Sequence, residues 1–544
     1  MTLTTPRRRS LASIVALSAA ALSWMVALPG ARTPAGASPV TAIVDPALRA
    51  AQGTVGVIVQ GAGSVESSVR QMGGRITHDL PLIGGFSARV PASDIPRIAQ
   101  LPGAAALTLD RPTQVQSAPG TYNNTASVFK QATNGDKLAN AGANGQGVTV
   151  ALIDTGVTAL PDIKNALVPV VPDVSNLGLQ PCLNLTDEPT CADSYGHGTF
   201  MAGIIAGNGS ASGGKYVGMA PNTKILSIKI AGRDGSSDVS TVIAALQWVV
   251  QNKAAYNIRV VNLSLGTDST QSYHVDPLDF AAEQAWFAGV VVNVAASNRG
   301  PSSYTISDPA NDPFVITVGA VDDKGTSGTG DDVLPNFSGH GPTVTDNLAK
   351  PDVVAPGAHI VSLAAPGASI TTQFPSTMAA PYRRGSGTSM ANAVVSGLVA
   401  QMISAQPTLT PDRVKFMLTS TAHKDASNDP LAVGAGIVDG SAAMVAGAGV
   451  ANQGVQPGLG TGSLEAARGT VGVVLDDGSG TVLDGTSGCL TSTLTCLDTS
   501  GASWFGASWF GASWFGASWF GTSSSTEDYG ASWFGSTWYG AWDQ

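Results

Sequence analysis

The stretch Val148-Thr149-Val150-Ala151-Leu152-Ile153-Asp154-Thr155-Gly156-Val157 decides the fold class of this chain of 544 residues. Its apolar run, β-branched at several positions, predicts a strand buried in a parallel sheet. The run ends in a carboxylate and a glycine turn. Asp154 should therefore lie at the carboxyl end of its strand, where α/β sheets place their active sites. We expect an α/β fold with a mainly parallel central sheet.

Two further segments carry residues suited to nucleophilic chemistry. Asp193-Ser194-Tyr195-Gly196-His197-Gly198 places His197 between two glycines, directly before an apolar helical pattern. Gly385-Ser386-Gly387-Thr388-Ser389-Met390-Ala391 places Ser389 before a second such pattern. Helix N-terminal amides favour developing negative charge, so this is a suitable place for a nucleophilic hydroxyl.

Asp154, His197 and Ser389 complement one another chemically. A neutral serine hydroxyl is a poor nucleophile, so an imidazole must take its proton and later deliver it to the leaving amine. A carboxylate must hold that imidazole in one tautomer and stabilise its charged form. Taken singly, Asp154 could be a turn residue, His197 a surface-loop histidine and Ser389 a helix N-cap. Their joint occurrence favours a catalytic triad.

In these motifs the chain resembles the subtilisin-like serine proteases, over roughly residues 130–447. The chain order Asp, His, Ser is that of subtilisin, whereas α/β-hydrolases run Ser, Asp, His around a G-x-S-x-G elbow. The resemblance implies a subtilisin-like fold of three layers and a serine endopeptidase that forms an acyl-enzyme. It also implies protein or peptide substrates and no required cofactor.

The resemblance also assigns an oxyanion donor. A second buried-strand run, residues 290–296, is followed by Asn298, which matches the asparagine that donates to the tetrahedral oxyanion beside the Ser389 backbone N–H. Three positions depart from the family pattern, which usually has glycine, histidine and proline there: Ser297, Phe200 and Asn392. Ser297 bears on the backbone freedom of its loop. Phe200 and Asn392 carry no proton transfer, so at these two positions we expect altered packing with the chemistry intact.

Two segments would line the substrate site by the same resemblance: Ser264, Leu265 and Gly266, and Ala295, Ala296 and Ser297. The first would pair with an extended substrate backbone as an added strand. Small residues in both would wall a pocket that admits a large apolar side chain. The alternative is that both segments are simply strand ends.

Residues 1–37 have the pattern of a secretory signal. Arg7-Arg8-Arg9 precedes an apolar run, and Ala35-Gly36-Ala37 offers a small-residue cleavage site. A twin-arginine export route and a membrane anchor are the alternatives. Serines within the run and Pro29-Gly30 after it favour cleavage. The expected location is extracellular, with association to a cell wall or cell surface as a further expectation.

Residues 38–110 are predicted to form a propeptide. Within 51–110 the patterns predict strands and helices in the βαββαβ order of ferredoxin-like domains: 54–60, 64–72, 75–80, 83–90, 92–101 and 105–109. This order and Gly84-Gly85-Phe86-Ser87-Ala88 resemble the subtilase propeptide, a folding chaperone and inhibitor. An independent small domain is the alternative. The polar segment 111–129 is linker-like and should contain the maturation cut.

The four cysteines fit an oxidising compartment. Cys182 and Cys191 lie close in sequence, as do Cys489 and Cys496, and both pairs fall in turn-rich segments. Two local disulfides are therefore the simplest pairing. A cysteine metal site is not expected, because the chain has no C-x-x-C and no histidine beside either pair.

Charge excludes one class of partner. The net charge of −10 and the isoelectric point near 5.0 argue against nucleic-acid binding. Asp322-Asp323 and Asp331-Asp332 lie in Gly-rich loops of the kind in which the family often binds structural calcium. Such clusters more often mark solvated turns, so calcium stays a possibility without an assigned ligand.

The C-terminal part differs in composition. Residues 448–500, rich in Gly, Ser, Thr and Val, suit a linker or a small β unit. Residues 501–544 repeat Gly-Ala-Ser-Trp-Phe at period five, which makes no single aromatic stripe on a helix or a strand. Repeated turns or a flexible tail fit better, and exposed Trp could contact cell-wall sugars or a membrane interface. A low-complexity repeat without a fixed partner is the alternative.

Two functions are compatible with the sequence. The first is a secreted serine endopeptidase made as a zymogen. The second is a cell-surface or cell-wall binding protein whose aromatic tail is the working part and whose protease domain is secondary or inactive. The joint presence of the three motifs and Asn298 favours the first.

Overall fold

The structure is a computed structural model. It describes the following residues: 42–45, 48–49, 51–61, 63–110, 112–115, 127–171, 179–267, 269–424, 426–462, 473–474, 482–483 and 541–542. The predicted signal (1–37), the Cys489–Cys496 pair, nearly all of the repeat tail and most of the predicted linker 111–129 lie outside these residues.

An α+β unit comes first. Its five-stranded sheet has the order β1-β5-β2-β4-β3, antiparallel except for the pair β1 and β5. The elements are β1 (Ile43–Val44), β2 (Thr54–Gly61), α2 (Gly63–Gln71), β3 (Arg75–Leu80), β4 (Gly85–Pro91), α3 (Ile95–Ile98) and β5 (Ala104–Leu109). Apart from β1, this is the βαββαβ element order.

The second helix of this unit is shorter than the sequence pattern predicts. The pattern favours a helix over 92–101, but α3 covers only Ile95–Ile98, after a short 3-10 turn at Ala92–Asp94. Pro96 lies at the start of α3, where a missing N–H is tolerated, and it cannot support a helix that begins three residues earlier.

A seven-stranded sheet forms the centre of the following part of the chain. Its order is β15-β14-β13-β11-β7-β9-β8, and every neighbouring pair is parallel. The bounds are Val353–Pro356, Ile316–Val321, Val291–Ala295, Ile258–Leu263, Thr149–Asp154, Lys224–Lys229 and Leu183–Asn184. All six residues of β7 are buried, as expected for a strand covered on both faces. The predicted α/β fold with a mainly parallel central sheet is confirmed.

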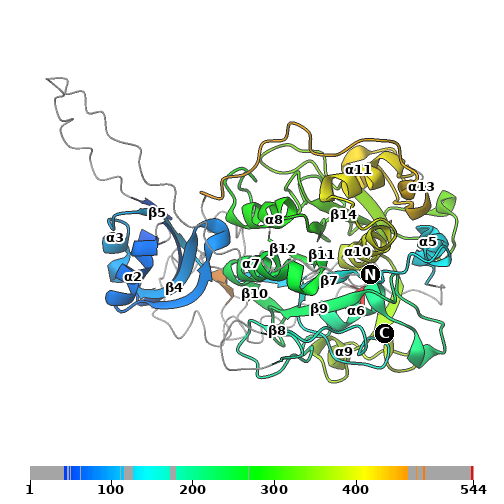
Figure 1. Cartoon of the computed structure of the whole chain (residues 1–544), viewed down its shortest axis with the longest axis horizontal. Coiled ribbons are helices and arrows are strands. Elements are labelled where there is room, and N and C mark those ends of the chain that lie inside the picture. Colours follow the sequence, from blue (N-terminus) through cyan, green and yellow to red (C-terminus); the bar gives the residue numbers. More distant parts are fainter. Residues whose placement is uncertain are drawn as a thin grey trace, which may run out of the picture. The chain divides into compact units, whose positions relative to one another are not determined.

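Helices form the two outer layers (Figure 1). α7 (Val239–Tyr256) and α8 (Pro277–Phe287) pack together and against β7, β11 and β13. α6 (His197–Ala206) and α10 (Thr388–Ala405) pack together, and α10 also contacts β11, β13, β14 and β15. His197 and Ser389 therefore lie on two helices, α6 and α10, that pack against each other. None of the described helices combines the length and apolar character needed to cross a membrane.

The remaining described elements are shorter. The helices are α4 (Phe129–Ala132), α5 (Gly135–Asn140), α9 (Ser369–Gln373), α11 (Pro411–Thr421), α12 (Pro430–Val433) and α13 (Gly440–Met444). One three-stranded sheet joins β10 (Ser236–Asp238), β6 (Pro112–Val115) and β12 (Leu265–Gly266). Another joins β16 (Ile360–Leu363), β17 (Tyr382–Ser386) and β20 (Ala541–Trp542). A further pair is β18 (Val473–Val474) with β19 (Val482–Leu483).

Cys182 and Cys191 form a disulfide, with Cα atoms 5.8 Å apart and nine positions apart in sequence. The bond closes a segment that begins directly before β8, contains that strand, and ends shortly before His197. It therefore restricts the segment that delivers the histidine.

We expect the double variant Cys182→Ser/Cys191→Ser to lose about 2–3 kcal/mol of unfolding free energy, because the unfolded loop is no longer closed. Denaturant unfolding followed by circular dichroism measures the change. Thr190→Ala, at an exposed position in the same loop, is the control and should stay within about 0.5 kcal/mol of the parent. Equal stability of the double variant and the control would contradict this role.

Candidate functional site

Asp154 is the last residue of β7 and is only 1% exposed. Its Oδ1 accepts hydrogen bonds from the Thr155 backbone N–H at 2.8 Å and the Thr155 hydroxyl at 3.3 Å. His197 Nδ1 lies 2.8 Å from Oδ1 and 3.0 Å from Oδ2. A buried polar group is costly unless it is hydrogen-bonded, and here the histidine supplies one of the partners of the carboxylate.

His197 is the first residue of α6 and is fully buried. Its Nε2 makes no hydrogen bond to any part of the chain that the structure describes. With Nδ1 directed at a carboxylate, Nδ1 carries the proton in the neutral ring, and Nε2 can accept one. The ring is therefore oriented as a base whose acceptor nitrogen is unused.

Asp193 fixes the turn before His197. Its carboxylate accepts from Gly196 N at 2.6 Å, Thr199 N at 2.7 Å and the Thr155 hydroxyl at 2.8 Å. Burial raises the pKa of this carboxyl, and the hydrogen bonds oppose that rise. Asp193 thereby links the loop after Asp154 to the first turn of the His197 helix.

Gly156 and Gly198 allow the loop after β7 to approach the start of α6 closely. A Cβ at Gly198 would lie 2.2 Å from the carbonyl oxygen of Gly156, a distance that no side chain can adopt. Gly156 itself has φ +99°. Gly156, two residues after Asp154, and Gly198, directly after His197, therefore let the loop after β7 touch the start of α6 backbone to backbone.

Lys229, at the end of β9, holds the same two loops from the other side. Its ammonium is fully buried and donates to Thr155 O at 3.1 Å and Ala192 O at 2.6 Å. It also pairs with Glu188 at 2.9 Å. Burial raises the pKa of Glu188, but hydrogen bonds from Ser194 and Lys229 outweigh it, so the net pKa lies below its usual value.

Ser389 is the second residue of α10 and is fully buried. Its hydroxyl lies 3.4 Å from the carbonyl oxygen of Ser264, and the Ser264 hydroxyl lies 3.4 Å from Ser389 O. The start of the serine helix is thus in contact with the first of the predicted substrate-binding residues.

Asn298, which follows β13, contacts the residue before Ser389. Its Oδ1 accepts from Thr388 N at 2.7 Å and from the Thr388 hydroxyl at 2.8 Å. With Oδ1 held in this way, the orientation of the amide is set, and Nδ2 faces away from Thr388. The structure therefore places the predicted amide donor one residue from the predicted nucleophile.

Ser297 adopts a backbone conformation suited to glycine. Its φ is +130°, in a region that residues with a Cβ rarely adopt. The Ser297 hydroxyl donates to Thr305 O and accepts from Arg299 N at 3.4 Å, and Ser297 O accepts from Gly339 N at 2.8 Å. Side-chain and backbone bonds thus hold a strained residue next to Asn298.

Phe200 and Asn392, the other departures from the family pattern, behave differently. Phe200 is fully buried in the main apolar core, as expected for altered packing. Asn392 instead donates to Asn262 Oδ1, Leu263 O, the Ser264 hydroxyl and Asn293 O at 3.0–3.3 Å. A buried polar network therefore joins α10 to β11, β13 and Ser264 below the nucleophile.

The predicted substrate-binding residues lie at strand ends on this side of the sheet. Leu265 and Gly266 form β12, which pairs with β6 through Leu265↔Val115 and Gly266↔Gln114. On its other edge β6 pairs with β10. Ala295 ends β13, and Ala296 O accepts from Ser307 N at 3.0 Å. An extended segment of the chain thus already lies along β12.

The acidic loops predicted to suit calcium have other partners. Asp322 pairs with Lys324 at 2.6 Å, and Asp323 Oδ1 accepts from Gly325 N at 3.0 Å. Asp331 accepts from the Thr326 hydroxyl at 2.8 Å. Within the part of the chain that the structure describes, a different group of buried carboxylates has oxygens close enough together for one metal ion: Asp276, Asp279 and Asp308.

We expect Ser297→Gly to be more stable than Ser297→Ala by about 1 kcal/mol or more. Alanine keeps the backbone strain and loses the bond to Thr305 O, whereas glycine removes the strain. Denaturant unfolding of the two variants measures the difference. If Ser297→Ala were instead more stable than Ser297→Gly, which is the usual order for these two residues, Ser297 would carry no backbone strain.

The sequence comparisons agree with this geometry. The model of the subtilase family matches residues 145–451. "Serine protease AprX" of Bacillus subtilis (strain 168) is 39% identical over 305 residues, which cover 54% of this chain and 65% of that protein. The chain thus spans less than two thirds of AprX. "Subtilisin DY" of Bacillus licheniformis is 32% identical over 311 residues, which cover 57% of this chain and 94% of that protein.

A solved structure supports the same fold. Fervidolysin from Fervidobacterium pennivorans, described as a keratinolytic enzyme related to subtilisin, aligns with a TM-score of 0.56 at 22% identity. The alignment covers 81% of this chain and 66% of that one. Together with the parallel sheet and the Asp154–His197 contact, these matches show that the chain belongs to the subtilase family of subtilisin-like serine proteases.

Proposed function

We propose that the protein is a secreted serine endopeptidase, made as a zymogen, that uses Asp154, His197 and Ser389. The observation that carries the proposal is the fully buried His197 ring. Its Nδ1 lies 2.8 Å from Asp154, and its Nε2 has no partner within the described residues. A buried imidazole with an unused acceptor is costly for stability alone, but it suits a general base.

In this mechanism Ser389 Oγ attacks the scissile carbonyl carbon. His197 Nε2 takes the hydroxyl proton, and the Asp154 carboxylate stabilises the resulting imidazolium. When the tetrahedral intermediate collapses to the acyl-enzyme, the same proton passes to the leaving amine. A water molecule then attacks the acyl carbon while His197 Nε2 takes its proton. That proton passes to Ser389 Oγ as the ester bond breaks, which releases the acid product and restores Ser389.

Asn298 Nδ2 and the Ser389 backbone N–H would bind the oxyanion. The contacts of Asn298 Oδ1 with Thr388 support this role, because they fix the amide before substrate arrives. A donor that needs no reorganisation stabilises the transition state at little cost, and removing one typically lowers turnover ~10²–10³-fold.

A peptide substrate would lie where β6 lies, between β10 and β12. The pairing of β12 with β6 supports this, because it shows which backbone groups of Leu265 and Gly266 are available to an added strand. Ser264 and the segment Ala295, Ala296 and Ser297 would complete the first specificity pocket.

The α+β unit would act as the inhibitory propeptide. Its residues contact α7 directly: Gln247 donates to Asp79 O at 2.7 Å and accepts from Leu82 N at 2.9 Å. β6 follows this unit in the chain and lies within residues 111–129, which are expected to contain the maturation cut, so this segment would occupy the substrate position before cleavage. The Cys182–Cys191 disulfide supports an oxidising, extracellular location. No observation on the described residues favours the alternative, a surface-binding protein with an inactive protease domain.

We expect Ser389→Ala to lower casein hydrolysis by ~10⁶-fold and Asp154→Asn by ~10⁴-fold. Ser386→Ala is the matched control, because Ser386 is a buried serine of β17 that accepts from His359 N. It should change turnover by less than tenfold. Equal activity of the parent and Ser389→Ala would exclude Ser389 as the nucleophile.

Maturation provides a second test. If the chain cuts itself, the parent protein should acquire a new N-terminus within residues 111–129, and the Ser389→Ala chain should retain its propeptide. Intact-protein mass spectrometry and N-terminal sequencing measure both. Identical cleavage of the Ser389→Ala chain would mean that another protease performs this step.

A further inference from the structure

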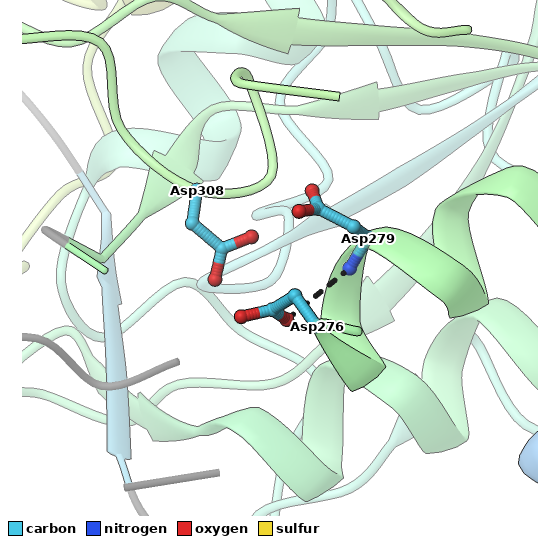
Figure 2. Close-up of side chains that lie close together, drawn as sticks. All are labelled: Asp276, Asp279 and Asp308. Atoms are coloured by element: carbon cyan, nitrogen blue, oxygen red, sulfur yellow. Dashed lines mark hydrogen bonds between the residues drawn. The ribbon is translucent and has the colours of Figure 1, made fainter. Parts of the chain in front are cut away.

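Three carboxylates outside the proposed triad converge in the interior (Figure 2). Asp276 caps α8 and accepts from Leu278 N at 2.8 Å, Asp279 lies in the first turn of the same helix, and Asp308 lies in the loop after β13. All three are at most 1% exposed. One oxygen from each lies within 4.8 Å of the others.

Hydrogen-bond donors reach only some of the oxygen atoms of these three carboxylates. Asp276 Oδ2 accepts from the Ser269 hydroxyl at 3.3 Å and Gln271 Nε2 at 2.9 Å, and Asp308 Oδ2 accepts from the Thr267 hydroxyl at 3.2 Å. Asp279 Oδ2 accepts from Asn311 Nδ2 at 3.0 Å. The other oxygens of Asp279 and Asp308 have no partner among the described residues, and neither does the side-chain carbonyl of Asn311, which is only 6% exposed.

The charges are also uncompensated. No lysine, arginine or histidine of the described chain forms an ion pair with any of the three. Buried carboxylates without cationic partners must either bind protons or bind a metal ion.

We propose that Asp276, Asp279 and Asp308 bind one hard divalent cation of the calcium type, with the Asn311 carbonyl as a neutral ligand. All four proposed ligand atoms are oxygens, which such cations prefer. Two ligands of one Ca²⁺, each at 2.3–2.6 Å, can be at most roughly 5 Å apart, and the observed spacing satisfies this limit. A proton shared between two carboxylates would leave the Asn311 carbonyl unused.

The cation would connect α8 to the substrate side of the sheet. Thr267 and Asp308 form an isolated antiparallel bridge, with Thr267 N donating to Asp308 O at 2.8 Å and Asp308 N donating to Thr267 O at 2.9 Å. Thr267 directly follows β12. A cation on Asp308 would therefore steady Leu265 and Gly266, and this consequence, unlike the binding itself, rests on the proposed peptidase function.

Calcium titration of the full chain carrying Ser389→Ala, which cannot digest itself if the proposed function holds, tests the site. The protein is first stripped with a chelator at pH 7.5. We expect isothermal titration calorimetry to show binding of about one Ca²⁺ and a melting temperature that rises by several degrees with saturating calcium. Asp279→Asn and Asp308→Asn should each weaken the affinity at least tenfold and raise the melting temperature of the calcium-free protein.

Asp323→Asn is the control, because Asp323 belongs to the other acidic loop and is also buried. It should retain the parent affinity. The proposal fails if the parent binds no calcium, if both asparagine variants bind like the parent, or if Asp323→Asn alone loses binding. Because these readouts do not use peptide hydrolysis, an inactive protein with Ser389 intact would refute the proposed function and leave this test of calcium binding unaffected.

Discussion

The bond between His197 Nδ1 and the buried Asp154 carboxylate is the contact on which the rest of the site depends. A carboxyl group that is 1% exposed is costly to bury unless hydrogen-bond donors surround it. The strand β7 delivers Asp154 to the sheet edge, and α6 must begin at His197 to reach it. Gly198 and Gly156 permit the approach, while Asp193 and Lys229 tie together the loops that carry the two partners.

A second set of buried polar contacts supports the nucleophile. Asn392 spans from α10 to the ends of β11 and β13. The network fixes α10 relative to Ser264, and the Thr388–Asn298 contact fixes it relative to the proposed oxyanion donor. Side-chain hydrogen bonds thus hold the start of α10 in place.

Much of the fold and of the site was predictable because it depends on local sequence. The apolar run at 148–157 predicts β7, and the glycine-flanked motifs predict where α6 and α10 begin. The supporting residues were not predictable in this way. Lys229 ends an apolar strand and belongs to no recognisable motif. A lysine at such a position nevertheless indicates that its buried charge needs partners. Asp276 and Asp308 are far apart in sequence, so only the tertiary structure reveals that they converge.

The central claim is that Ser389 is a nucleophile activated by His197. Its most direct test is covalent labelling of the matured protein with an organophosphonyl fluoride, followed by mass spectrometry of the peptides. The account predicts one phosphonyl group, carried by Ser389, and no labelling of the His197→Ala variant. Labelling of another residue, or an unmodified Ser389 in protein that hydrolyses peptides, would contradict it.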